Sequence, residues 1–142
     1  MEVRIQRILA EEITIAGQLI EILVNEQAAL THDDVDSLHK VLEDKGHAIT
    51  QLEGLSVERE RLQSETTNGK ALVRQSAQWN QLVRLIRRCD DLNQVNGRIV
   101  AVNRNRAGQA LSILKGGTGS SDTYSAKGEA STSHARHAIT QA

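Results

Sequence analysis

Residues 82–114 read LVRLIRRCDDLNQVNGRIVAVNRNRAGQALSIL. Leucine, isoleucine and other apolar side chains recur there about every 3.5 residues, which predicts one long amphipathic helix with a coiled-coil-like seam. Asn96 and Asn103 fall on this seam, so the helix cannot form an entirely apolar interface. Polar residues at seam positions fix the register of packed helices at a cost in stability.

Two further helices are predicted before this stretch. Over residues 3–30, apolar side chains recur at spacings of three and four on two adjacent stripes, so this helix is expected to face two neighbours. A second helix is predicted over residues 33–64, with Lys45 and Arg59 interrupting its apolar seam. Thr31 followed by Asp34 resembles a capping box at its start.

The remaining segments have the composition of loops. Residues 64–70 contain Ser, Thr, Asn and Gly, which predicts a loop, and the third helix is expected over residues 77–115. We therefore predict an all-α fold, an elongated antiparallel three-helix hairpin or bundle with coiled-coil-like seams, formed by residues 1–115. Residues 116–142 are rich in Gly and Ser and poor in apolar groups, which predicts a flexible tail.

Composition and cysteine content bound the class of protein. The chain has 142 residues, no Phe, no Pro and one Cys, Cys89, so an intramolecular disulfide is impossible. We found no secretory signal pattern, and these two observations predict a cytoplasmic protein. The longest apolar-rich stretch, residues 13–24, is interrupted by polar side chains and falls short of the ~20 apolar residues of a spanning helix. No membrane insertion is expected.

Charge is distributed unevenly along the chain. Residues 1–65 hold 6 Lys and Arg against 14 Asp and Glu, whereas residues 66–115 hold 9 against 2. We expect the basic third helix to pack on the acidic hairpin with opposite charges facing each other. A less favoured alternative is a nucleic-acid-binding regulator, because no aromatic residues lie among the arginines that would make the contact. These arginines are Arg84, Arg87, Arg88, Arg98, Arg104 and Arg106.

No catalytic or metal site is predicted. His39, Glu43 and His47 lie on one helical stripe, but a third ligand that could join a chelating pair has no evident source. Cys89 occupies a seam position, where a thiol behaves as a small apolar group. The chain has no glycine-rich phosphate loop after a strand. We therefore expect no enzymatic activity, no metal and no cofactor.

Several short motifs resemble those of one known family. The third helix contains LNQVNG at residues 92–97, and YSAKG follows at residues 124–128 after a Gly/Ser spacer. Their order and spacing resemble the FlgN family of flagellar type III export chaperones. The resemblance implies binding to the hook–filament junction proteins FlgK and FlgL, prevention of their premature assembly, and delivery to the cytosolic domain of the export-gate component FlhA.

The resemblance and the helical pattern together suggest two sites. Apolar residues near the end of the third helix exceed what one seam can bury, and an amphipathic client helix could lie in the groove that they form. The predicted client-binding residues are Ile99, Val100, Val102, Ala107, Leu111 and Leu114. Tyr124 and Gly128 match the tail residues that the resemblance implies for docking at the export gate. A helical adaptor or structural protein without a client is the alternative.

Overall fold

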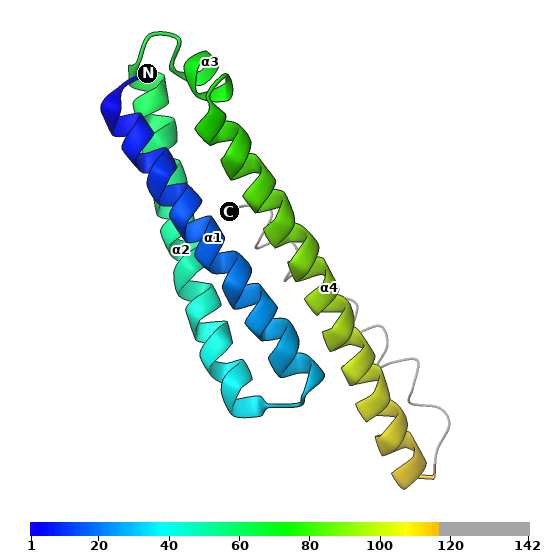
Figure 1. Ribbon diagram of the computed structural model, residues 1–142. Helices are drawn as coiled ribbons and strands as arrows, with labels where there is room; N and C mark the ends of the chain where they lie inside the picture. Colours follow the sequence, from blue (N-terminus) through cyan, green and yellow to red (C-terminus); the bar gives the residue numbers. More distant parts are fainter. Residues whose placement is uncertain (117–142) are drawn as a thin grey trace.

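The computed structural model describes residues 1–116, which form four α-helices (Figure 1). They are α1 (Val3–Thr31), α2 (Val35–Glu65), α3 (Gly69–Arg74) and α4 (Ala77–Leu114). The described residues contain no strand, and the predicted all-α fold is confirmed. Within the same residues, no helix has both the length and the apolar character that a membrane span requires. The predicted tail lies outside the described residues except for Gly116, and the division of the chain at residue 115 stays a prediction.

Helix α1 is the central helix and packs against both α2 and α4. The chain reverses direction between α1 and α2 and again before α4, so α4 runs parallel to α1 (Figure 1). The Cys89 thiol lies 3.6 Å from the Ala16 carbonyl oxygen. The side-chain nitrogen of Asn96 lies 3.0 Å from the Leu23 carbonyl oxygen. Both pairs are 73 residues apart in sequence, so α1 and α4 keep one register along their interface.

Helix α4 extends beyond the turn that joins α1 to α2 (Figure 1). With the 73-residue offset, Thr31 at the end of α1 is level with Arg104. About ten further residues of α4 follow, which is roughly 15 Å of helix at 1.5 Å per residue. The hairpin therefore leaves the end of α4 without a neighbouring helix among the described residues.

The apolar core consists of two clusters. One contains Ile5, Leu9 and Ala16 of α1 with Leu62, Val73 and Leu82, and the other contains Leu19, Leu23, Ala48, Leu52, Cys89 and Leu92. Ile86 of α4 packs against both clusters and connects them. Aliphatic side chains from the predicted seams thus supply the core, as expected of thin interfaces between long helices.

The segment between α2 and α4 is not a simple loop, and the prediction of three helices omitted α3. Val73 of this short helix is fully buried in the core beside Ile5 and Leu62. A side chain at Gly69 would collide with the backbone of Gln63, so this close approach requires glycine. Asn68, just before it, has a φ of 57°, a left-handed conformation that Asn tolerates.

Side-chain caps set the start of α2 and of α4. Asp34 accepts a hydrogen bond from the Ser37 backbone nitrogen at 3.1 Å, so α2 begins at Val35 rather than at residue 33. Thr31 is the last residue of α1, and the capping box predicted from it is not formed. Ser76 accepts from the Trp79 backbone nitrogen at 3.1 Å and caps α4 in the same way.

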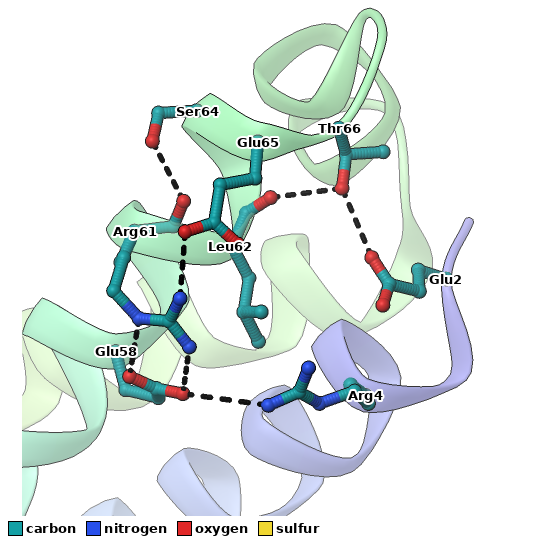
Figure 2. A network of polar contacts seen from close by, with 8 residues as sticks. All are labelled: Glu2, Arg4, Glu58, Arg61, Leu62, Ser64, Glu65 and Thr66. Carbon is teal, nitrogen blue, oxygen red and sulfur yellow. Dashed lines mark hydrogen bonds and ion pairs between the residues drawn. The ribbon is translucent and has the colours of Figure 1, made fainter.

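Polar contacts at the surface hold the start of α1 against the end of α2 (Figure 2). Arg61 binds Glu58 at 2.7 Å and Glu65 at 2.6 Å, and Arg4 of α1 lies 3.9 Å from Glu58. The Thr66 hydroxyl lies 3.0 Å from the Glu2 carboxylate. Because these pairs are exposed to solvent, they add little to the stability of the fold.

The basic helix α4 packs on α1 of the acidic hairpin as predicted, but the expected facing of opposite charges is not found. Within residues 1–116, every ion pair joins α1 to α2 or lies inside α2, and none involves an arginine of α4. The reason is geometric, because Leu, Cys and Asn occupy the side of α4 that faces α1. The arginines of α4 are all exposed, and they are Arg84, Arg87, Arg88, Arg98, Arg104 and Arg106.

Candidate functional site

Two polar layers cross the three long helices. In the first, which we call the Glu12 layer, Arg59 of α2 lies 2.8 Å from Glu12 of α1 and stacks 4.9 Å from the ring centre of Trp79 of α4. In the second, the Glu26 layer, Lys45 of α2 lies 3.0 Å from Glu26 of α1 and 2.8 Å from Asn93 of α4. Long polar side chains of α2 thus bridge to α4 at both levels.

The two layers follow the heptad repeat. The two layers are 14 residues apart in each of the three helices. The pairs of residues are Glu12 and Glu26 in α1, Arg59 and Lys45 in α2, and Trp79 and Asn93 in α4. Leu19 of α1, Leu52 of α2 and Ile86 of α4 lie one heptad from each layer and belong to the same apolar cluster. Polar and apolar layers therefore alternate along the three helices in one common register.

Burial affects the acid of the first layer. The Glu12 side chain is 3% exposed, and desolvation raises the pKa of its carboxyl above the ordinary value, although the hydrogen bond and charge of Arg59 lower it. Cys89 is also buried, and desolvation raises the pKa of its thiol to about 11. The thiol therefore stays protonated near neutral pH and is a poor nucleophile.

A groove opens beside the Glu26 layer, with a volume of about 490 Å³. Leu30 of α1 contributes to its lining together with Leu38 and Leu42 of α2. From α4, residues between Asn93 and Ala107 line the other side. All three long helices thus contribute to one largely apolar groove, with polar groups at its Glu26 end and Asn103 and Arg104 further along α4.

The heptad register explains why the groove exists. One heptad beyond Lys45 and Asn93 come Leu38 of α2 and Val100 of α4, and both line the groove. Leu30 is the last residue of α1 in the lining, and α1 ends at Thr31, which the α1–α4 register makes level with Arg104. Ala107 of α4 therefore lies beyond α1, and no α1 side chain covers this outer end of the groove.

Asn96 lies at the buried end of the groove. Its side-chain nitrogen donates to the Leu23 carbonyl at 3.0 Å and to the Glu26 carboxylate at 2.7 Å. Asn96 is only 2% exposed, and its Oδ1 has no hydrogen-bond partner within residues 1–116. The seam position predicted to fix register is thus hydrogen-bonded on one side of the amide only.

The structure separates the predicted client-binding residues. Val100 and Ala107 line the groove, whereas Ile99, Val102, Leu111 and Leu114 do not. Val102, Leu111 and Leu114 are exposed, the last by 83%, and Ile99 is half-buried. The predicted gate-docking residues, Tyr124 and Gly128, lie outside the described residues.

Sequence reasoning missed the α2 wall of the groove and the acids of the polar layers. Lys45 and Arg59 were recognised as interruptions of a seam, but Glu12 and Glu26 were not identified as their partners. The signal was present, since each acid lies on the α1 face among buried apolar residues, 14 positions from the other. Pairing them required the relative alignment of α1 and α2.

The hollow between α1 and α2 and the histidines of α2 are weaker candidates for a functional site than the groove. A hollow of about 580 Å³ is lined by α1 and α2 alone, including Ala10, Ile15 and Leu55, and contains no buried polar group. Within residues 1–116, no group of three or more potential metal ligands gathers. His39 and His47 are exposed, and His47 lies 3.9 Å from Glu43 in a solvated contact.

Comparison with known proteins agrees with the geometry. A family model described as FlgN protein matches residues 1–132. Searches of curated protein sequences and of solved structures found no match. The match covers all four helices, and hence both polar layers and the groove.

Proposed function

Because the chain belongs to the FlgN family of flagellar export chaperones, we propose that it binds the hook–filament junction proteins FlgK and FlgL in the cytoplasm. Binding keeps these clients from assembling prematurely and brings them to FlhA at the export gate. The groove beside the Glu26 layer is the observation that carries the proposal. It is open, largely apolar and lined by all three long helices.

The groove suits an amphipathic helix of a client. Such helices bind by placing apolar side chains at spacings of three and four into a hydrophobic groove. Leu38, Leu42 and Val100 offer the matching surface, and Leu42 is 47% exposed in the free protein. A client helix there would cover the outer end of the groove, which extends along α4 past the end of α1.

The end of α4 extends the same surface. Beyond Ala107, Leu111 and Leu114 are 40% and 83% exposed, with no helix of the hairpin beside them. Burying a leucine fully is worth about 1.5–3 kcal/mol, so these two residues can add substantially to client affinity. We therefore assign client binding to the groove and to the overhanging end of α4 together.

Calorimetric titration of purified FlgK and FlgL into the full-length chain tests the proposal. Ala107→Glu places a charge in the groove and should weaken binding at least tenfold, whereas Asn105→Glu, which places that charge at an exposed position outside the groove, should not. Circular dichroism checks that both variants remain helical. Absence of binding by the unmodified chain, or equal binding by both variants, contradicts the assignment.

Delivery to the gate is assigned to the tail. The resemblance of residues 124–128 to the family's tail motif supports Tyr124 and Gly128 as the docking segment, and a tyrosine offers apolar area and one hydroxyl to a small pocket. Tyr124→Ala should leave client affinity unchanged and weaken binding of the client-loaded chain to the cytosolic domain of FlhA. A loss of client affinity instead would show that the tail belongs to the client site.

A further inference from the structure

One buried acceptor at the head of the groove is not paired within residues 1–116. We propose that Asn96 determines client specificity, because its Oδ1 accepts a hydrogen bond from a donor side chain, an amide or a hydroxyl, on the apolar face of the docked client helix. This inference rests on the proposed function, since the donor belongs to the client. The groove would otherwise accept any amphipathic helix of suitable shape, and Asn96 adds the requirement for one hydrogen-bond donor on the client.

The orientation of the Asn96 amide is fixed. Its nitrogen donates to both the Leu23 carbonyl and the Glu26 carboxylate. Rotating the amide by 180° would bring Oδ1 against these two acceptors and would lose both bonds. Oδ1 therefore remains an acceptor, and it needs a donor from elsewhere.

Lys45, the cation of the same layer, already donates to other acceptors. The Lys45 ammonium carries three donors, and it lies 3.2 Å and 3.0 Å from the two Glu26 oxygens and 2.8 Å from Asn93 Oδ1. These three contacts use its hydrogen-bonding capacity. Asn96 Oδ1 has no partner within residues 1–116, and buried acceptors of this kind are rare in folded proteins.

Asn96 places this acceptor at the inner end of the groove, where Oδ1 is buried in the free chain. Asn96 lines the groove at the end where Glu26 and Lys45 form its polar head. Val100 lies one helical turn further along α4 and also lines the groove. A client helix whose apolar anchor packs on Val100 reaches Asn96 with the side chain one turn before or after that anchor.

The acceptor distinguishes between amphipathic helices. A helix with a correctly placed donor pairs an acceptor that is buried and unpaired in the free chain, whereas an entirely apolar helix leaves it unpaired. The gained hydrogen bond favours the donor-bearing helix by about tenfold. The layer therefore selects for a polar residue at one position of an otherwise apolar client face.

Two matched variants test the proposal in the full chain. Asn96→Leu removes the acceptor, and Asn105→Leu makes the same change at an exposed position of α4 outside the groove. Titration with FlgK and FlgL should show about tenfold weaker binding by N96L and unchanged binding by N105L. Urea denaturation reports how much each variant changes the stability of the free chain.

The client side provides a measurement that needs no folded variant of the chaperone. Each amide or hydroxyl residue of the client's bound helix is replaced by alanine and titrated against the unmodified chain. One such replacement should weaken binding about tenfold, and the same replacement should have little further effect on N96L.

The outcomes separate this inference from the proposed function. If the unmodified chain binds the clients but N96L binds as tightly, or if no client donor is sensitive, Asn96 is not a specificity determinant and the proposed function stands. If the unmodified chain binds neither FlgK nor FlgL, the proposed clients are wrong and the inference fails with them.

Discussion

Glu12 of α1 and Arg59 of α2 form an ion pair at 2.8 Å, with side chains only 3% and 8% exposed. The same guanidinium stacks on Trp79 of α4 and donates to Ser56 at 3.1 Å. One planar group therefore joins all three long helices at the end of the bundle opposite the groove. A lysine could replace the charge of Arg59 but neither its planar stacking nor its several fixed donors.

Removal of Arg59 should be strongly destabilising. Arg59→Ala leaves the Glu12 carboxylate buried without its partner, and breaking a buried pair in this way costs about 3–5 kcal/mol. The double change Glu12→Leu with Arg59→Met removes both charges and should cost clearly less. Lys40→Ala is the control, because its contact with Asp44 is exposed and 3.9 Å long. Urea denaturation measures all three, and a loss for Arg59→Ala no larger than for Lys40→Ala would refute a structural role of the pair.

The raised pKa of Glu12 predicts a pH dependence of stability. Between its ordinary value of 4.5 and its higher folded value, the folded state binds more protons than the unfolded state at this site. The contribution of Glu12 to the free energy of unfolding is therefore present below pH 4.5 and is lost as pH rises through the folded pKa. Glu12→Gln should remove this contribution. Urea denaturation between pH 4 and 8 measures the free energy of unfolding of the unmodified chain and of Glu12→Gln. If the two free energies change in parallel with pH, Glu12 does not titrate in this range.

Two glycines should respond oppositely to alanine. Gly46 lies inside α2, and a methyl group added there would meet nothing within 4 Å, so Gly46→Ala should stabilise the chain by up to about 1 kcal/mol. Gly69→Ala would bring a methyl group against the backbone of Gln63 and should destabilise α3 and its contact with the core. Thermal unfolding followed by circular dichroism compares them. Equal effects of the two changes would mean that the close approach at Gly69 is not required.

The sequence predicts the long helices well because their apolar periods are long and regular. It also places Asn96, Lys45 and Arg59 correctly as polar interruptions of the seams. It does not predict α3, because six residues in a segment of loop composition carry no periodic signal. Val73 is held in the core by tertiary contacts, and these do not appear in a local pattern.

The groove could be predicted only in part. The apolar excess at the end of the third helix identified Val100 and Ala107, which line it. The α2 wall and the Glu26–Lys45 pair depend on which residues of α1 and α2 are level with each other, and helical periodicity does not fix that alignment. Charge totals were misleading for a similar reason, because a count of arginines does not say which side of α4 they occupy.

The overhanging end of α4 should contribute to client binding through one side only. Leu111→Asp with Leu114→Asp removes apolar surface that continues from the groove, and it should abolish binding of FlgK and FlgL while the chain remains helical. Gln109→Asp with Ile113→Asp adds two negative charges at neighbouring exposed positions on another side of α4. Since both pairs lie beyond the hairpin, neither should lower the unfolding midpoint much, and calorimetry can compare affinities directly. Unchanged affinity of the leucine variant would restrict the client site to the groove, whereas equal losses from both pairs would point to a general effect of negative charge.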